Sequence, residues 1–506
     1  MRGKSISALT SVETTKRQRE WVRKVRKERP PAGMEEYLQD WTRFFDQYAA
    51  QVDHWHRINA DYHKGIASLA RFYIPPGARV LEVGSGNGDL LAALNPSYGV
   101  GIDISSEMVR RAAQKYPHLK FFQMPAERLD LSGERFDFVI LSDLLGYLYD
   151  IRLVFERLRS VCHPRTRLFL HWYSRVWQPV LEIAEKLGLK YPQPLVNWTT
   201  VEDVSGLLSL SEFEPVHCRR HTLLPKSVPL LSTFANRYLA HLPGFRWLCL
   251  TNVIVARPLD VAPQSTPYRV SVICPCRNES ANIEHVAQRL PAMGAHTELI
   301  LVEGHSKDDT LQKCREVAKA TPIKDIKVFV QEGTGKADAV RLGFSQASGD
   351  ILMILDADLS VDPEDLPQFY DALVKGKGEF INGSRLVYAM DPKAMRFLNL
   401  LGNKFFAILL SRFLGQAIKD TLCGTKVMWR NDYQRIAAGR DYFGDFDPFG
   451  DFDLLFGAAK LNLKIVEVPV RYRERSYGVT NISRFSHGWL LLKMSVRAAT
   501  KLLFIS

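Results

Sequence analysis

A proline-rich segment divides this chain and limits its fold to two domains of the same class. Residues 258–267 read Pro-Leu-Asp-Val-Ala-Pro-Gln-Ser-Thr-Pro, with three prolines in ten positions. Such a stretch is typical of a linker. On both sides of it, short apolar runs with strand character alternate with helical patterns, which predicts two α/β domains. The two halves carry different motifs and no internal repeat, so the sequence indicates a fusion of two activities.

The predicted strands alternate with helices in each half of the chain. They are expected at 79–83, 99–103, 119–123, 136–141 and 167–172 before the linker, and at 269–275, 298–302, 327–331, 351–355 and 379–382 after it.

Composition excludes several classes of protein. With 46% hydrophobic and 24% charged residues, the 506-residue chain is neither disordered nor fibrous. Its seven cysteines lack paired spacing, which argues against a disulfide framework or a zinc cluster. We see neither an apolar signal segment nor a run of the roughly 18 apolar residues that a membrane span needs. We therefore expect a protein of the reducing cytoplasm.

The first 60 residues are expected to form a basic, helical extension. Residues 1–30 hold ten lysines and arginines against three glutamates, a large part of the chain's net charge of +12. Such a segment can contact an anionic membrane or nucleic acid, or it can be a solvated tail. Trp21 is the one aromatic residue interleaved with these cations, which argues against nucleic acid as the partner.

Three alternate glycines follow the first predicted strand of the first half. The segment 79–88 reads Arg-Val-Leu-Glu-Val-Gly-Ser-Gly-Asn-Gly, and a helical pattern follows it. Glycines let the backbone turn tightly and approach a ligand closely. A dinucleotide site would have GxGxxG spacing, whereas GxGxG after the acidic Glu82 suits a cofactor without phosphates and with a positive charge. Asp103 ends the next predicted strand, where a carboxylate can accept both ribose hydroxyls.

On these residues, the region 61–257 resembles the class I S-adenosylmethionine-dependent methyltransferases. The resemblance implies a Rossmann-like fold and S-adenosylmethionine as cofactor. It also implies that the cofactor is bound by Glu82, Gly84, Gly86, Gly88 and Asp103, with Glu127 near the adenine. Ser142 and Asp143 would face the methyl group. His171 is either a base or a packed core histidine, and a domain that keeps the loop without methyl transfer remains an alternative.

In the second half, four polar motifs follow predicted strands in succession. They lie at 275–279, 303–310, 333–338 and 356–358, and the last reads Asp-Ala-Asp. Open α/β sheets bind ligands at the carboxyl ends of their strands. Two carboxylates separated by one residue can direct one hard divalent cation at a diphosphate.

This ordered set resembles family-two glycosyltransferases with the GT-A fold, over residues 268–485, especially the branch with the dolichyl-phosphate mannosyltransferases. The resemblance implies a nucleotide-sugar donor and a Mg²⁺ or Mn²⁺ ion held by Asp356 and Asp358. The donor would be contacted by Pro275, Arg277, Glu279, Glu303, Lys336, Asp338, Asp356 and Arg385. Gly304 departs from the family, which usually has an Asp pair at this point.

The family usually places its catalytic acidic residue where this chain has Asp451 and Asp453, and we expect Asp453 to be the base. Arg473 and Arg475 match the segment that binds an acceptor phosphate. The implied reaction inverts the configuration at the anomeric carbon of the sugar. A lipid phosphate is already an anion near neutral pH and needs cations, whereas a hydroxyl acceptor needs a base. A soluble saccharide or a protein remains an alternative acceptor.

The C-terminal residues 486–506 are expected to form an amphipathic helix. Lys493, Arg497 and Lys501 recur every four residues on a leucine-rich background, which suits a helix lying in a lipid interface. The alternative is a core-facing helix whose long cations reach water. The sequence as a whole predicts a bifunctional enzyme, a methyltransferase joined to a hexosyltransferase-type glycosyltransferase. We expect it to act in lipid-linked glycan synthesis, peripherally at the cytoplasmic face of a membrane.

Overall fold

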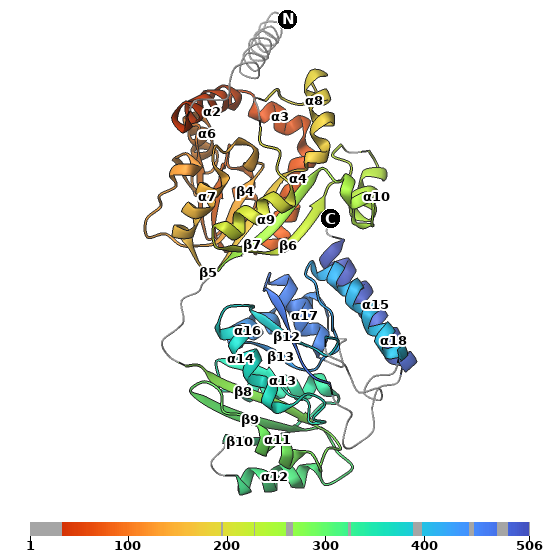
Figure 1. Cartoon of the computed structure of the whole chain (residues 1–506). Helices are drawn as coiled ribbons and strands as arrows, with labels where there is room; N and C mark the ends of the chain where they lie inside the picture. Colours follow the sequence, from red (N-terminus) through yellow and green to blue (C-terminus); the bar gives the residue numbers. More distant parts are fainter. Residues whose placement is uncertain are drawn as a thin grey trace, which may run out of the picture. The chain divides into compact units, whose positions relative to one another are not determined.

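The computed structural model describes residues 33–193, 196–226, 228–259, 267–321, 325–387, 397–444, 450–472 and 484–504. These residues form two compact units, and the first ends at Leu259 (Figure 1). The basic head at 1–30 and most of the proline-rich linker lie outside the described residues.

The first unit is built on a mixed, seven-stranded sheet. Its order is β3 (Lys120–Gln123), β2 (Tyr98–Asp103), β1 (Arg79–Val83), β4 (Phe136–Ser142), β5 (Cys162–Tyr173), β7 (Thr251–Pro258) and β6 (Phe213–His221). The strands from β3 to β5 are parallel, whereas β7 is antiparallel to both β5 and β6. Glu82 is paired with Gly101 on one side and with Ile140 on the other. The carboxyl ends of β1, β2 and β4 are therefore level with one another.

Helices cover both faces of this sheet. They are α4 (Ala60–Tyr73), α5 (Asp89–Ala93), α6 (Ser106–Lys115), α7 (Ile151–Leu158), α8 (Gln178–Lys186), α9 (Val201–Leu210) and α10 (Leu231–Arg237). Before them, α2 (Met34–Ala49) packs against α6, and α3 (Val52–Ile58) follows. Trp41, Phe44 and Trp55 of α2 and α3 are buried with Tyr191. Residues 34–60 therefore pack on the first unit, although the sequence placed a boundary at residue 60, because their aromatic face needs cover.

The second unit also contains a mixed, seven-stranded sheet. Its order is β10 (Asp325–Val330), β9 (His296–Glu303), β8 (Arg269–Cys276), β11 (Ile351–Ile354), β13 (Lys426–Trp429), β12 (Phe380–Ser384) and β14 (Ile465–Pro469). The first four strands are parallel, and β13 runs antiparallel between β11 and β12. The helices are α11 (Ile283–Arg289), α12 (Thr310–Ala320), α13 (Lys336–Gln346), α14 (Leu366–Val374), α15 (Phe397–Leu414), α16 (Arg430–Ala438), α17 (Asp451–Lys460) and α18 (Arg484–Ala498).

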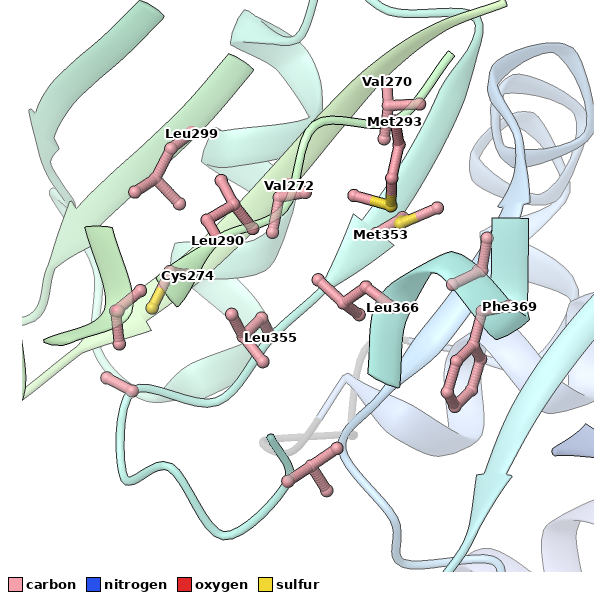
Figure 2. Packing of buried hydrophobic residues seen from close by; sticks show 14 of the residues in the cluster. Val270, Val272, Cys274, Leu290, Met293, Leu299, Met353, Leu355, Leu366 and Phe369 are labelled. Carbon is pink, nitrogen blue, oxygen red and sulfur yellow. The ribbon is translucent and has the colours of Figure 1, made fainter. Parts of the chain in front are cut away.

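A continuous apolar core holds the central strands of the second unit (Figure 2). Val270 and Val272 of β8 and Met353 of β11 face Leu366 and Phe369, which belong to α14. All five are buried. Each such side chain contributes about 1.5–3 kcal/mol on burial. This packing fixes where β8 and β11 end, and those ends carry the predicted donor site.

Within the same unit, α15 and α18 lie side by side (Figure 1). Met494, Ser495 and Ala498 on one face of α18 are buried, whereas Trp489 and Val496 on another face are exposed. In the described parts of the chain, no helix combines the length and the hydropathy that crossing a bilayer requires.

Candidate active sites

The glycine loop of the first unit joins β1 to α5. Gly84, Gly86 and Gly88 have φ of 75°, 51° and 80°, in the left-handed region that favours glycine. A Cβ added at Gly84 would lie 2.8 Å from Leu144 Cδ1, and one added at Gly88 would lie 2.7 Å from Phe121 Cζ. At Gly86 an added Cβ would meet no described atom within 4 Å. Gly84 and Gly88 thus allow internal packing, and Gly86 borders open space.

Asp103 joins the end of β2 to this loop. One carboxylate oxygen accepts from the Gly86 amide at 2.8 Å, and the other accepts from the Ser105 amide at 2.9 Å. Burial raises the pKa of Asp103 to about 6, although these hydrogen bonds act in the opposite direction. The structure therefore brings Asp103 and Gly86 together at the carboxyl end of the sheet. Both residues were predicted to bind the cofactor.

Glu82 and Glu127 are both buried and bound to backbone amides. Glu82 accepts from the Leu91 amide at 3.1 Å, and burial raises its pKa to about 8. Glu127 accepts from the Tyr149 amide at 2.8 Å. These two carboxylates hold the chain segments that follow β1 and β4.

A second polar group at this end of the sheet centres on Asp143. The Tyr62 hydroxyl, from α4, donates to both carboxylate oxygens at 2.8 and 3.0 Å. His171 Nδ1 lies 3.1 Å from Asp143 Oδ1, and the Asp143 amide donates to the His171 carbonyl. Burial, followed by the charge of Asp143, raises the pKa of Tyr62. Asp143 was expected, with Ser142, to face the methyl group, and His171 was expected to be either a base or a packed core histidine; Tyr62 was missed.

Two further imidazoles lie nearby, of which His63 interacts electrostatically with Asp143. The rings of His56 and His63 have their centroids 4.0 Å apart, and His56 Nδ1 is 3.2 Å from Asp89 Oδ2. Burial, with the neighbouring His56, lowers the pKa of His63 to about 4. His63 is therefore neutral near pH 7.

In the second unit, lysines and carboxylates alternate where β11, β13 and the starts of α13 and α17 meet. Lys336 Nζ lies 2.7 Å from Asp356 Oδ1, and Lys426 Nζ lies 3.0 Å from Asp451 Oδ1. Burial alone would lower the pKa of Lys336, but Asp356, followed by Asp451 and Asp358, raises it. All three carboxylates therefore act on this one ammonium group.

Asp356 and Asp358 suit a hard cation by the chemistry of their oxygens. Asp358 is buried, and one of its oxygens accepts from the Ser360 amide at 3.0 Å. A Cβ at position 424 would lie 2.0 Å from Asp356 Oδ2, so Gly424 leaves this oxygen room. In the described residues, no group of three metal-ligating His, Cys, Asp or Glu side chains occurs. Diphosphate oxygens of a substrate would have to complete the coordination of Mg²⁺ or Mn²⁺ here.

Asp453, the predicted base, has a different setting from Asp451. Its carboxylate accepts from Arg440 Nε at 2.6 Å and lies 3.5 Å from Arg341 Nη2. Two guanidinium groups thus hold Asp453, whereas Asp451 faces Lys426 and acts on Lys336. Asp451 therefore lies in the cluster with Lys336 and Asp356, whereas Asp453 is held by arginines.

The residues predicted for the nucleotide gather at the ends of β8 and β9. Cys276 is paired with Glu303, which brings the Pro275–Glu279 segment beside Glu303. Glu303 accepts from the Ser306 amide at 2.5 Å, and Glu279 accepts from Asn282 Nδ2 at 2.7 Å. The side chain of Arg277 is exposed. A hollow of about 660 Å³ opens beside Glu303 and Ser306 and runs along α12.

Two known families match this chain, one in each unit. A family described as methyltransferase domain matches residues 80–165, and glycosyl transferase family 2 matches residues 271–437. The chain joins a methyltransferase domain to a family 2 glycosyltransferase domain. The mixed sheets of the two units are accordingly a methyltransferase fold and a GT-A fold, as predicted.

Curated relatives match the glycosyltransferase domain. A dolichol-phosphate mannosyltransferase of Pyrococcus furiosus is 34% identical over 220 residues, which are 42% of this chain and 59% of the relative. An undecaprenyl-phosphate 4-deoxy-4-formamido-L-arabinose transferase of Klebsiella pneumoniae is 25% identical over 219 residues, which are 42% of this chain and 63% of the relative. The chain thus spans about three fifths of the length of these relatives.

Solved structures are similar to each domain. A magnesium protoporphyrin IX methyltransferase from Synechocystis, solved with bound SAH, shares 18% identity at a TM-score of 0.32, over 44% of this chain and 99% of its own. A glucosyl-3-phosphoglycerate synthase from Mycobacterium tuberculosis, solved with Mn²⁺ and UDP, shares 20% identity at a TM-score of 0.35, over 46% of this chain and 80% of its own.

The glycosyltransferase domain holds its predicted donor residue Arg385 in a bidentate pair. Arg385 Nε and Nη2 donate to Asp420 at 2.7 and 2.8 Å. Burial acts to raise the pKa of Asp420, but its hydrogen bonds with Arg385 lower this pKa to about 2. Asp338 accepts from the Gly333 amide and so closes the turn before α13. The predicted acceptor residues Arg473 and Arg475 lie outside the described residues.

Sequence reasoning missed Asp420 and Lys426 in this domain. Lys426 is completely buried on β13, and Asp420 is completely buried beside Arg385. A lone lysine at the start of the apolar run Lys426–Trp429 is the one signal that could have found the first of them, because an unpaired buried lysine is costly.

Proposed function

We propose that the glycosyltransferase domain moves a sugar from a nucleotide-sugar donor to a lipid phosphate of the polyprenyl type, with inversion at the sugar. The observation that carries this proposal is the cluster of Asp356, Asp358, Asp451 and Lys336 at the carboxyl end of the sheet. The names of the two curated relatives support the acceptor class. The two names give different sugars, but each name includes a polyprenyl phosphate.

The side chains of this cluster divide the work of the reaction. Asp356 and Asp358 would hold a Mg²⁺ or Mn²⁺ ion, which when bound draws charge onto the departing diphosphate. Lys336 would turn its ammonium group from Asp356 to the same diphosphate when the ion takes that carboxylate. Lys426 gives the buried carboxylate of Asp451 a counter-ion at 3.0 Å, so neither charge is enclosed alone.

The acceptor determines what Asp451 must do. A lipid phosphate attacks as an anion and needs no base, so Asp451 would have no proton to accept and would serve as the counter-ion of Lys426. A hydroxyl of a soluble saccharide or a protein would give its proton to Asp451 as the new glycosidic bond forms. The second case remains the alternative acceptor class.

We propose that the methyltransferase domain binds S-adenosylmethionine with its ribose at Asp103 and its backbone contact at Gly86. The open space at Gly86 and the position of Asp103 at the end of β2 support this. The Tyr62, Asp143 and His171 group would orient the methyl acceptor and take its proton. A domain that binds the cofactor without methyl transfer remains an alternative.

We also propose that α15 and α18 rest on the cytoplasmic surface of a membrane. Phe405 and Ile408 of α15 are exposed, as are Trp489 and Val496 of α18. Lys493 and Arg497 lie exposed on α18. Lys501 was expected to share this stripe, but its ammonium group lies 4.7 Å from the ring centroid of Tyr442. One face of α18 is buried, as expected of a core-facing helix. Another face is exposed, as expected of a helix in a lipid interface.

The first experiment assays sugar transfer to a polyprenyl phosphate with a set of nucleotide sugars and Mg²⁺ or Mn²⁺. We expect Asp356→Asn to lose at least about a hundredfold in kcat, because it removes a charge at the reaction centre. Asp451→Asn should also lose transfer, and it is compared only where thermal unfolding shows a folded second unit, because it leaves Lys426 buried without its counter-ion. S-adenosylmethionine binding should survive in both variants. The matched variant Asp453→Asn tests the original expectation, because it changes the same chemical group two residues away.

The result separates the alternatives. Near-normal metal-dependent transfer in Asp356→Asn would overturn the assignment of the cluster. A folded Asp453→Asn variant that loses transfer while Asp451→Asn keeps it would return the base role to Asp453. Turnover with soluble saccharides but not with polyprenyl phosphate would replace the lipid acceptor with the soluble one.

A further inference from the structure

The connection between β6 and β7 of the methyltransferase domain carries a cluster of exposed, large apolar side chains. We call it the β6–β7 surface and define it by Leu230, Leu231, Phe234, Tyr238, Trp247 and Leu248, all of which are exposed. Leu230 is 88% exposed and Trp247 is 50% exposed. Isolated apolar residues on a surface need no explanation, but a contiguous group marks an interaction site.

These side chains project from an ordered scaffold. The side chain of Asn236 accepts from the amides of Leu223 and Leu224 and donates to the Leu224 carbonyl, each at 2.8 Å. Trp177 Nε1 donates to the Leu248 carbonyl at 2.7 Å, which ties the segment to the start of α8. Beneath the exposed residues, Ala235 and Cys249 are buried. The apolar groups are thus held outward while the backbone behind them is anchored.

The backbone conformation at Leu230 directs this leucine toward solvent. Its φ is +63°, and the Leu231 amide donates to the Pro229 carbonyl at 2.7 Å, which makes a tight three-residue turn. Such turns are rare and strained for residues other than glycine. A strained turn that presents a leucine to solvent has no packing benefit within the described part of the domain.

The segment that carries this surface has charge of one sign, and Glu202 of α9 is an acidic group outside it that acts on Arg220. Residues 215–250 contain five basic residues and no Asp or Glu; the five are Arg219, Arg220, Lys226, Arg237 and Arg246. The guanidinium carbon of Arg220 lies 3.9 Å from the ring centroid of Trp247, and that of Arg246 lies 5.3 Å from it. Cations and aromatic rings are therefore interleaved on one patch. An apolar interface with another protein is instead depleted of charge at its centre.

We propose that the β6–β7 surface binds the surface of an anionic lipid bilayer. The leucines and Phe234 would enter the boundary between headgroups and acyl chains, Trp247 and Tyr238 would lie at headgroup level, and the arginines would pair with lipid phosphates. The inference goes beyond the proposed function, because it gives the methyltransferase domain a lipid contact of its own. It stands whether the sugar acceptor is a lipid or a soluble saccharide.

The test uses the full chain and vesicles of phosphatidylcholine with or without phosphatidylglycerol. Because α18 can also bind lipid, the measurement is made in a Lys493→Glu and Arg497→Glu background. We expect this background to keep co-sedimenting with anionic vesicles and to lose at least about tenfold in affinity when Leu231→Glu and Phe234→Glu are added. The matched control is Leu210→Glu on α9, which changes another exposed leucine (64%) of the same domain. It should bind as its background does.

A second measurement does not depend on the folding of the charged variants. Brominated lipids quench tryptophans that reach the bilayer, so Trp247→Phe should remove part of the quenching seen in the unmodified chain. Trp489→Phe reports the contact of α18 separately. S-adenosylmethionine binding by the variants confirms that the methyltransferase domain is folded.

Three results would overturn the proposal. The first is unchanged vesicle binding by a folded Leu231→Glu and Phe234→Glu variant. The second is quenching that Trp247→Phe leaves intact. The third is a chain that is dimeric without vesicles and becomes monomeric in the Leu231→Glu and Phe234→Glu variant, because the surface would then join two copies of the protein.

Discussion

At the scale of single residues, Asp103 links pH to cofactor binding. A carboxylate can accept hydrogen bonds from both ribose hydroxyls, and a protonated carboxyl group loses part of this capacity. Because burial raises the pKa of Asp103 to about 6, this loss begins roughly two pH units above that of an ordinary aspartate. We expect S-adenosylmethionine affinity to be constant above pH 7, to fall as the pH drops through about 6, and to level off near the affinity of Asp103→Asn.

Calorimetric titrations between pH 5 and pH 8 would measure this dependence. Asp103→Asn is the control: it should bind the cofactor weakly at every pH, because an amide donates where the carboxylate accepts. A wild-type affinity that stays level through pH 5 would show that Asp103 does not contact the ribose.

Other residues of the two sites show where sequence reasoning ends. Asp356 and Asp358 could be found because both lie in one short motif directly after a strand. Tyr62 and Asp143 are 81 positions apart, and Lys426 and Asp451 are joined across two elements. Such contacts depend on how the elements pack, so no local pattern announces them. The predictions for Arg473 and Arg475 remain predictions.

At the scale of elements, the loop between β1 and α5 contains glycines with two different roles, one in packing and one beside open space. A side chain at Gly84 would meet Leu144, whereas one at Gly86 would enter open space. We expect Gly86→Val to abolish S-adenosylmethionine binding, as a side chain would occupy the place of the cofactor. The cost in stability should be only about 1–2 kcal/mol, from the left-handed backbone.

Gly84→Val is the matched control, because the same substitution two residues earlier collides with protein. It should lower the melting temperature of the first unit far more than Gly86→Val does. Calorimetry and thermal unfolding on both variants would check this. Cofactor binding by Gly86→Val at wild-type affinity would remove Gly86 from the site.

The elements themselves were predicted unevenly. The parallel strands β1, β2, β4, β8, β9 and β11 are buried on both faces and appear in the sequence as apolar runs. Strands β6, β7, β13 and β14 were missed. β6 mixes apolar residues with His217, Arg219 and Arg220, and β13 spans only Lys426–Trp429. The pairing of β6 and β13 depends on antiparallel neighbours that are distant in sequence, so the residues of these two strands carry a weak signal.

At the scale of the whole molecule, each unit has its own sheet and its own core. We therefore expect thermal unfolding in two transitions. S-adenosylhomocysteine at 100 times its Kd should stabilise the methyltransferase domain by about 2.7 kcal/mol and raise only its transition. A nucleoside diphosphate with Mn²⁺ should raise only the other. Differential scanning calorimetry would show this, and a single transition shifted by both ligands would mean that the domains unfold together.

The buried pair of Lys426 and Asp451 has a consequence for how this protein can change over generations. Loss of either partner leaves one charge enclosed without its counter-ion, at a cost of about 3–5 kcal/mol. That is a large fraction of the stability of an ordinary domain. A lineage that alters one of these positions must therefore pass through a poorly folded ancestor or change both at once. Natural variation should be rare at each position and correlated between them, so the pair would persist even in descendants that acquire a new donor sugar.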